Sequence, residues 1–159
     1  MVYIAVDLAQ KSTGITISVD KNIVCGFTIN NILTTKYKEG DIEQIKEAGE
    51  RFMYRINNSL ESSSIKEEKI TFLIEYNINP LNVKFEKFSL SFIAFLAGMW
   101  NKHIFIPIQA SRWMKVANTI FSIKRDKYPN GKEGNKKWIS DIAIHLAPHL
   151  SLIHISEPT

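Results

Sequence analysis

The first nineteen residues constrain the fold most, because they form two strand-like runs separated by a short polar stretch. The first run, residues 1–6, is apolar and ends at Asp7, and the second, residues 15–19, alternates apolar and polar side chains. β-Branched and aromatic residues fill both runs, as they do in strands. A charge at the end of such a run usually meets a counter-charge, a metal ion or a turn. The chain is therefore expected to begin with a strand that holds a carboxylate at its end.

A second carboxylate occupies the same kind of position further along the chain. Glu75 follows the apolar run of residues 70–74. If the two strands are neighbours in one sheet, Asp7 and Glu75 lie within a few ångströms of each other, and like charges that close need a cation between them. Their all-oxygen ligand set suits Mg²⁺ or Mn²⁺. Either acid alone is equally a turn or surface residue, but the two together predict a metal site.

The remaining pattern places strands early and then alternates helix and strand. Asp41 is a typical N-cap for the first helix, whose apolar stripe includes Ile42 and Phe52. This order predicts an α/β domain. The expected strands span residues 2–8, 14–20, 22–29, 70–75 and 103–107, and the expected helices span 41–60, 84–99, 111–121 and 135–146.

Three short pieces carry a family resemblance: Tyr3-Ile-Ala-Val-Asp7, then Ser12-Thr-Gly14, then Phe72-Leu-Ile-Glu75. In this order they resemble the RuvC-like Holliday-junction resolvases, above all the phage-type branch, which belong to the RNase H-like nucleases. The resemblance runs from about residue 2 to residue 149 in element order, with residue-level matches only in the short pieces. It implies an RNase H-like mixed sheet, with three antiparallel strands followed by parallel strands and with helices on both faces.

The resemblance also implies a chemistry. In that family the first-strand Asp, a Glu on the fourth strand and two acids on the last helix hold two divalent ions, so Asp7 and Glu75 become both catalytic and metal-binding residues. Asp141 is a candidate third ligand, although its helix resembles the one that precedes the acidic helix. Lys115 resembles a lysine near the scissile phosphate, and Lys136 a second one. The implied activity is metal-dependent cleavage of branched DNA by a homodimer, in DNA recombination and repair.

A basic segment supports contact with nucleic acid. The net charge is +4, and residues 122–137 hold six basic and two acidic residues while the rest of the chain is neutral. Its Pro and Gly residues predict a loop that can follow a phosphate backbone, although a solvated, mobile loop explains a charge run equally well. The expected DNA-binding residues are Lys11, Arg112, Lys124, Arg125, Lys127, Lys132, Lys136 and Lys137.

The last ten residues, 150–159, match one reading frame of a transposase-type sequencing-library adapter, codon for codon. Such a segment is excluded from fold reasoning. We therefore expect one RNase H-like domain over residues 1–149, a non-native tail over 150–159, and loss of the final helix with its closing pair of acids. A chain truncated in this way can be an inactive enzyme.

Composition is consistent with one compact domain. The 159 residues are 45% hydrophobic and 23% charged, which is enough apolar material for one core. The single Cys25 excludes an internal disulfide. The sequence has no secretory leader, no run of about 20 apolar residues and no phosphate-binding glycine motif. We therefore expect a cytoplasmic protein, of a bacterium or a phage-infected cell, with neither a membrane partner nor a nucleotide cofactor.

Two other classes of function remain open from the sequence. A non-cleaving protein of the same fold that binds branched DNA would keep the basic segment and lack the closing acids. An actin-like or sugar-kinase-like ATP-binding domain also begins with a strand, an acid and a Gly- and Ser/Thr-containing turn, but it needs a second phosphate loop. Nucleotide affinity without DNA affinity would favour that class.

Overall fold

A computed structural model describes residues 1–66, 69–76 and 83–146 of the chain. Two compact units make up this structure: Met1–Gln109, and a second unit that begins at Ala110 and is described as far as Leu146. The sequence predicted one domain over residues 1–149. The expected non-native tail, residues 150–159, lies outside the described residues.

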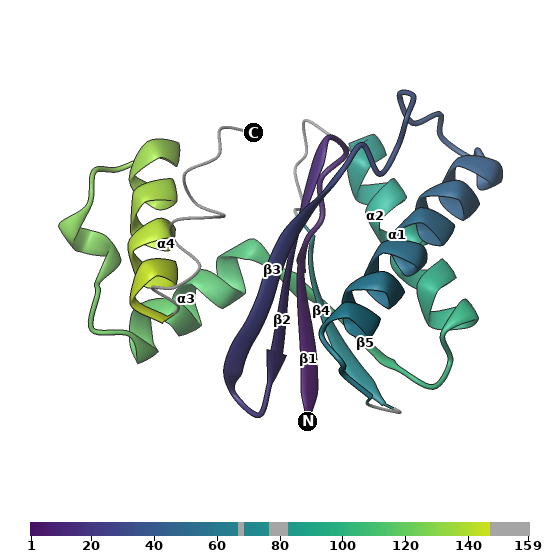
Figure 1. Cartoon of the computed structure of the whole chain (residues 1–159). Coiled ribbons are helices and arrows are strands. Elements are labelled where there is room, and N and C mark those ends of the chain that lie inside the picture. The colour runs from purple at the N-terminus through teal and green to yellow at the C-terminus, as the bar shows by residue number, and fades with distance from the viewer. Residues whose placement is uncertain (67–68, 77–82, 147–159) are drawn as a thin grey trace. The chain divides into compact units, whose positions relative to one another are not determined.

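The first unit is built on a five-stranded mixed sheet (Figure 1). Its strand order is β3-β2-β1-β4-β5, so the first strand of the chain lies at the centre. The strands are β1 (Val2–Asp7), β2 (Ser12–Val19), β3 (Asn22–Asn30), β4 (Ile70–Tyr76) and β5 (Ile104–Gln109).

Strand direction divides the sheet into two halves. β1, β2 and β3 pair antiparallel, with a bulge in β2 between Ile17 and Ser18, whereas β4 runs parallel to β1 and β5 runs parallel to β4. Short connections suffice for the antiparallel strands, while α2 provides the crossover between the parallel strands β4 and β5. The predicted sheet, three antiparallel strands followed by parallel ones, is confirmed.

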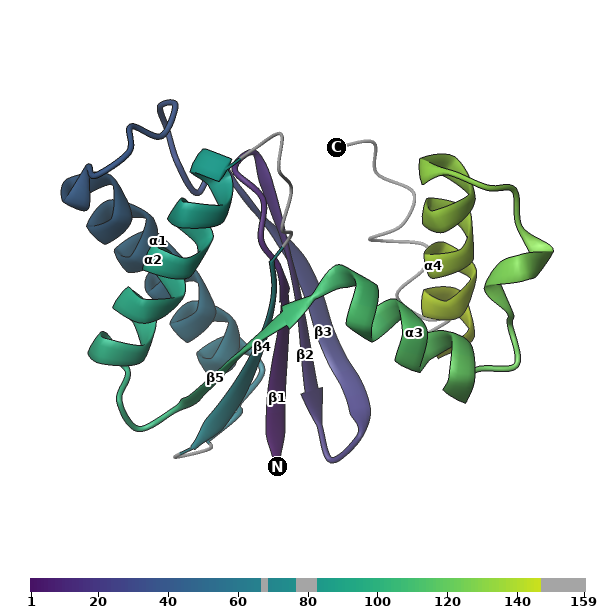
Figure 2. The same cartoon turned by 180° about the vertical axis from the view of Figure 1, so that it is seen from behind.

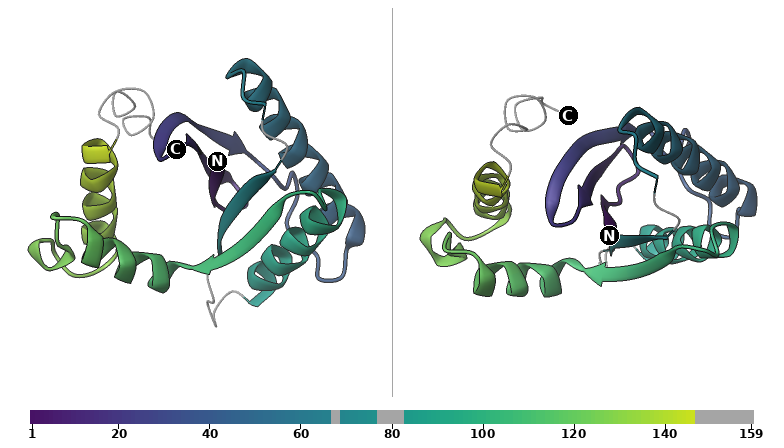
Figure 3. Two further views of the ribbon diagram at one scale, coloured as in Figure 1. Left: turned by 90° about the horizontal axis from the view of Figure 1, so that it is seen from below. Right: turned by 60° about the horizontal axis from the view of Figure 1, so that its bottom comes forward.

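Two helices, α1 (Ile42–Ser62) and α2 (Val83–Met99), lie together on one side of the sheet, as Figures 1 and 2 show from opposite sides and Figure 3 from below. Asp41 caps α1 as predicted, because its Oδ1 accepts a hydrogen bond from the Gln44 N–H at 3.2 Å. Ile42 was expected in the core and is instead 72% exposed. Ile42 begins α1, and the buried side chains of that helix start only at Gln44.

The core lies between these helices and the sheet. Alternation along β1 directs Val2, Ile4 and Val6 into it, and each is at most 2% exposed. An aromatic cluster fills the centre, where the Phe52 and Phe92 rings meet edge to face at 5.4 Å. Other fully buried members include Phe72, Phe88, Ile17, Ile56, Ile74 and Leu96.

The side of the sheet away from α1 and α2 is called the outer face here. On β1 it carries Tyr3, Ala5 and Asp7, all exposed. Within the described part of the first unit, no helix covers the outer face. Helices were expected on both faces of the sheet, and for the outer face this expectation stays a prediction.

The second unit is a pair of helices, α3 (Ala110–Ile120) and α4 (Lys132–Leu146), joined by a segment that contains the short 3₁₀ helix η1 (Arg125–Lys127). Its small core consists of Trp138, Ala117 and Ile142, which are nearly inaccessible, with Trp113, Met114 and Ile139 packed around them. The indole N–H of Trp138 donates to the Ile123 carbonyl at 2.8 Å. The tryptophan therefore anchors the core of this unit.

The basic segment is more ordered than the sequence indicated. Residues 122–137 were expected to be too broken for regular structure, yet they contain η1 and the first turns of α4. Gly131 turns the chain with a φ of +95°, and Gly134 sits buried in the first turn of α4 against the Pro129 carbonyl. The glycines here permit a turn and a close contact, so the expectation of a loop throughout was wrong.

The helices that the structure describes were compared with the length and hydropathy that a membrane span requires. None of them is both long enough and apolar enough to cross a bilayer.

Candidate metal site at the ends of β1 and β4

Asp7 and Glu75 are paired neighbours at the ends of two adjacent strands. The parallel register of β1 and β4 pairs Val2 with Ile70 and continues without a break to Asp7 opposite Glu75. Adjacent strands lie about 4.8 Å apart, and paired residues share a face of the sheet. Both carboxylates therefore belong to the outer face, at the carboxyl ends of their strands. The adjacency predicted from the sequence is confirmed.

Partial burial shifts the pKa of the Asp7 carboxyl. Its side chain still reaches solvent, but the neighbouring protein atoms remove part of its hydration, and this burial raises the pKa of the Asp7 carboxyl above its usual value. A second acid, Glu75, stands on the next strand. A partly desolvated anion that lies beside another acid gains more from a bound cation than an isolated, fully hydrated one. The pair thus suits an oxygen-liganded divalent ion such as Mg²⁺ or Mn²⁺.

The turn after Asp7 is held by Thr13. The Thr13 hydroxyl donates to the Ala9 carbonyl at 2.7 Å and also accepts from the Ala9 N–H at 3.3 Å, and the side chain is fully buried. A backbone hydrogen bond from the Asn31 N–H to the Lys11 carbonyl, at 2.8 Å, ties the same turn to the end of β3. Thr13 therefore fixes the end of β1, a role that the sequence did not reveal, and leaves the Lys11 side chain exposed.

Arg125 holds the second unit together. Its Nε donates to Asn135 Oδ1 at 2.5 Å, and its Nη1 and Nη2 donate to the carbonyls of Tyr128 at 3.2 Å and of Pro129 at 2.9 Å. Lys124 Nζ donates to the Asn118 carbonyl at 2.7 Å. These two cations are thus engaged at the ends of α3 and α4. Their predicted contact with DNA stays a prediction.

Asp141 also has a partner within the second unit. The Tyr128 hydroxyl donates to Asp141 Oδ2 at 2.6 Å, and this hydrogen bond, with burial second, raises the pKa of Tyr128. Sequence reasoning missed this pair, because thirteen residues separate its members. Among the described residues, no three Asp, Glu, His or Cys side chains are grouped so as to hold a metal ion. Asp141 as a third ligand stays a prediction.

The other predicted DNA-binding residues are exposed. Lys136 lies 3.5 Å from Glu133, one turn earlier on α4, in an ion pair that is largely open to solvent. Such pairs contribute little to stability. The exposed members are Arg112 on α3, Lys127 on η1, and Lys132, Lys136 and Lys137 on α4. Lys115 on α3, predicted as a catalytic lysine, is also exposed.

Charge is distributed unequally between the two units. Residues 110–146 hold eight basic and three acidic residues, whereas residues 1–109 hold twelve of each. The carboxylate pair therefore belongs to a neutral unit, and the whole basic excess belongs to the helical one. A polyanion would be attracted electrostatically by the second unit rather than by the first.

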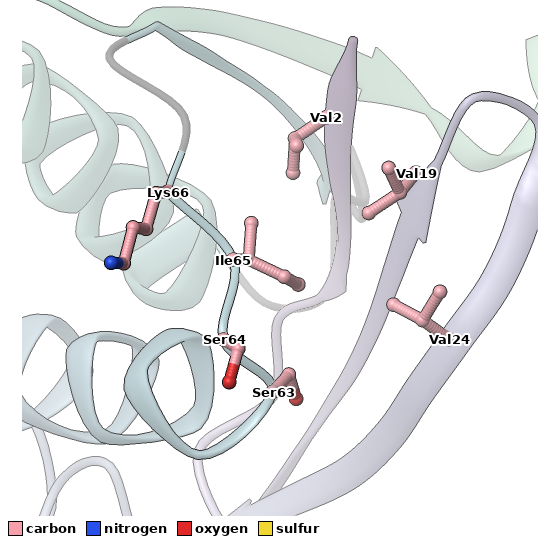
Figure 4. A pocket seen from close by; sticks show the side chains of 7 residues that line it. All are labelled: Val2, Val19, Val24, Ser63, Ser64, Ile65 and Lys66. Carbon is pink, nitrogen blue, oxygen red and sulfur yellow. The ribbon is translucent and has the colours of Figure 1, made fainter.

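A shallow pocket lies at the other end of β1 from Asp7, with a volume of about 380 Å³. Figure 4 shows Ile65 pointing toward Val2 and Val19, while the Lys66 ammonium extends away from the valines. No polar groups converge among its lining residues, so this pocket is poorly suited to a charged ligand. The residues that line it are Val2, Val19, Val24, Ser63, Ser64, Ile65 and Lys66.

The five-stranded mixed sheet and its helices define an α/β fold of the RNase H-like kind. A solved structure with this fold is T. thermophilus RuvC in complex with Holliday junction substrate. It matches with a TM-score of 0.53 and 14% sequence identity, over 100% of this chain and 84% of the RuvC chain. A likeness at this identity concerns the fold alone.

Two other solved structures are similar to a lesser degree. The ROK hexokinase from Thermus thermophilus has a TM-score of 0.46 and 11% identity over 74% of this chain, and an Aquifex aeolicus member of the Ppx/GppA family has 0.46 and 14% over 76%. The chain spans only 37% and 40% of those proteins. No family model and no curated protein matches the sequence.

Proposed function

We propose that this protein is a metal-dependent endonuclease that cuts branched DNA such as four-way junctions. The observation that carries the proposal is the register of β1 and β4, which pairs Asp7 with Glu75 on the outer face. The fold shared with RuvC, whose solved structure includes a Holliday junction substrate, supports the choice of substrate. We place the activity in the cytoplasm, where such DNA occurs.

Asp7 and Glu75 are the residues that would hold Mg²⁺ or Mn²⁺, with two ions in the complete site. When bound, such ions polarise the phosphodiester and lower the pKa of an attacking water. Asp7 supplies a partly desolvated carboxylate at the end of a central strand, and Thr13 keeps the turn beside it in place. Lys115 would contact a phosphate oxygen. To act as a third metal ligand, Asp141 would have to give up the hydrogen bond that its carboxylate accepts from the Tyr128 hydroxyl.

The basic second unit supports a role in DNA binding. Its net excess of five positive charges attracts a phosphate backbone through the release of counterions. We propose that the exposed lysines on η1 and α4 make these contacts, while Arg125 and Lys124 act mainly by holding the unit in shape. Two symmetric cuts in a four-way junction need two sites, so the active species is proposed to be a two-fold homodimer. Light scattering at several concentrations tests this assembly.

The direct test is cleavage of a fluorescent synthetic four-way junction, with linear duplex of the same sequence as the comparison substrate. Wild type with Mg²⁺ or Mn²⁺ should cut the junction, and Asp7→Asn or Glu75→Gln should each lower the rate by roughly 100-fold or more, the scale expected when one strong electrostatic group is removed. Glu47→Gln, an exposed acid on α1, is the matched control and should cut normally. Equal loss in all three variants would contradict the assignment.

One alternative has an observation in its favour. The described residues bring together no more than two acids in one place, and the second unit keeps its excess of five positive charges. A non-cleaving protein that binds branched DNA would need the positive charges and not a full set of metal ligands. Gel-shift titration with the junction separates the two functions. Affinity for the junction without cleavage in any divalent metal would favour the binding protein.

A further inference from the structure

The outer face changes in character from one edge of the sheet to the other. The row that contains the carboxylate pair reads Thr28, Gly14, Asp7, Glu75 and Ile108, from β3 across to β5. The next row inward reads Gly26, Thr16, Ala5, Leu73 and Ile106 in the same order. The side toward β2 and β3 is thus small and hydroxylated, and the side toward β5 is aliphatic, with Ile104 and Ile106 each about 40% exposed.

Gly14 stands directly beside Asp7 in this row, and the protein's own structure does not require a glycine there. Its φ is not in the left-handed region, and a Cβ built on it would meet only the Asp7 Cβ, at 3.6 Å, an ordinary contact distance. Glycine inside a strand is destabilising relative to alanine. A strand glycine without a conformational reason often marks a place where a ligand or another backbone approaches closely.

The space that Gly14 leaves opens toward polar neighbours. Thr28 flanks it on β3, and Thr16 follows it on β2, two residues along the same face. Both hydroxyls can donate to a phosphate oxygen, and such contacts position a nucleic acid without reading its sequence. On the other side of the pair, Ile108 and Leu73 offer no donor. A polyanionic strand should therefore bind better over β2 and β3, where hydrogen-bond donors lie, than over β4 and β5.

We propose that the DNA strand to be cut approaches Asp7 across β2, through the clearance left by Gly14, with the hydroxyls of Thr16 and Thr28 contacting its phosphates. This inference rests on the proposed function and adds to it the direction of the substrate. Gly14 is then a positioning residue, because it acts by leaving room rather than by touching the reacting atoms.

The test uses the full chain with Gly14→Ala and Gly14→Val. Gly14→Ala should fold, since a Cβ fits, and Gly14→Val introduces a β-branched side chain of the kind that strands favour. Circular dichroism checks that both are folded, and both should keep the rise in melting temperature that Mn²⁺ is expected to cause through Asp7 and Glu75. Cleavage of the four-way junction should fall about threefold for alanine and at least tenfold for valine, because a larger side chain fills more of the clearance. A Gly14→Val protein that binds Mn²⁺ and cuts at the wild-type rate would overturn the proposal.

The path across the sheet is tested with three matched Thr→Val variants. Thr16→Val and Thr28→Val should each weaken junction binding about three- to tenfold, whereas Thr71→Val, on β4 of the same face, should leave it unchanged. An equal loss for Thr71→Val, or no loss for the other two, would overturn the path. A wild-type protein that neither binds nor cuts DNA would instead refute the proposed function, and the inference with it.

Discussion

At the scale of single residues, Asp7 carries a structural cost that the proposed metal site would explain. Its carboxylate ends a central strand, where surrounding atoms raise its pKa, and a second acid lies on the next strand. A fold selected for stability alone would place an uncharged residue there. This cost is explained if a cation binds the two carboxylates, because binding of the cation to the folded protein then offsets the free-energy cost of desolvating Asp7.

Asp7→Asn should therefore stabilise the metal-free protein at neutral pH. Because the folded pKa of Asp7 is raised above 3.8, the ionised carboxylate lowers stability at neutral pH, and this penalty disappears as the pH falls through the raised folded pKa toward 3.8. We expect a rise in Tm of about 1–3 °C at pH 7, kept small because the side chain reaches solvent, and no rise near pH 3. Thermal unfolding in EDTA measures this, with Glu47→Gln as the control. A lower Tm for Asp7→Asn at pH 7 would contradict the electrostatic explanation.

His103 should produce a second pH dependence, of the opposite kind. Its Nδ1 accepts the Ile70 N–H at 3.1 Å at the start of β4, and burial, followed by the charge of Lys102, lowers the pKa of His103 below 6.5. Stability from the neutral imidazole is full above pH 6.5 and is lost as the pH falls from there through the lowered folded pKa.

The variant His103→Asn keeps an acceptor near that position and cannot titrate, so its Tm should fall less between pH 7 and pH 5 than the wild-type Tm. His145→Gln, at an exposed position on α4, is the control and should follow the wild type. Parallel curves for His103→Asn and wild type would show that another group carries the dependence.

At the scale of elements, local pattern was sufficient wherever a strand or helix has one buried side. Apolar runs identified β1 and β4, alternation identified β2, and the acids at the ends of β1 and β4 gave the correct pairing of Asp7 with Glu75. Boundaries shifted by a few residues, since helix and strand ends depend on capping and pairing rather than on periodicity. The start of α4 was missed because Gly134 has low helix propensity, and its tight contact with the Pro129 carbonyl depends on tertiary structure.

That tight packing makes Gly134 the most sensitive glycine of the second unit. A Cβ at this position would lie 1.7 Å from the Pro129 carbonyl oxygen, so Gly134→Ala must displace the backbone between η1 and α4. We expect a loss of about 1–3 kcal/mol in the free energy of unfolding. Gly98→Ala in α2, where a Cβ meets nothing within 4 Å, should instead gain about 0.5–1 kcal/mol. Urea unfolding of both variants checks the pair, and equal destabilisation of the two would refute the steric explanation.

At the scale of the whole molecule, the sequence located the basic excess in residues 122–137 but did not indicate the division into two units. No Gly- or Pro-rich linker marks the boundary, because β5 ends at Gln109 and α3 begins at the next residue. The boundary at Gln109 assigns this excess to one unit: the sheet unit is neutral, and the helical unit holds the excess of five positive charges.

This separation predicts how salt affects DNA binding. Replacing Lys127, Lys132 and Lys137 by Gln should weaken junction affinity and reduce the slope of log K against log salt by about 0.9 for each phosphate that is no longer neutralised. The matched triple variant in the first unit replaces the exposed residues Lys36, Lys46 and Lys69, and it should leave the slope near the wild-type value. Fluorescence anisotropy at several salt concentrations compares the two, and equal slopes would contradict a basic surface on the second unit.

Asp7 and Glu75 are proposed to form one metal site, and Mn²⁺ binding tests this site without depending on DNA. Titration of the protein with Mn²⁺, followed by the loss of the free-ion signal in electron paramagnetic resonance, should show binding to wild type and to Glu47→Gln. The same titration should show binding weakened by at least about tenfold in Asp7→Asn and in Glu75→Gln, since each removes one charged oxygen ligand. Wild-type affinity for Mn²⁺ in both of these variants would contradict a shared metal site at Asp7 and Glu75.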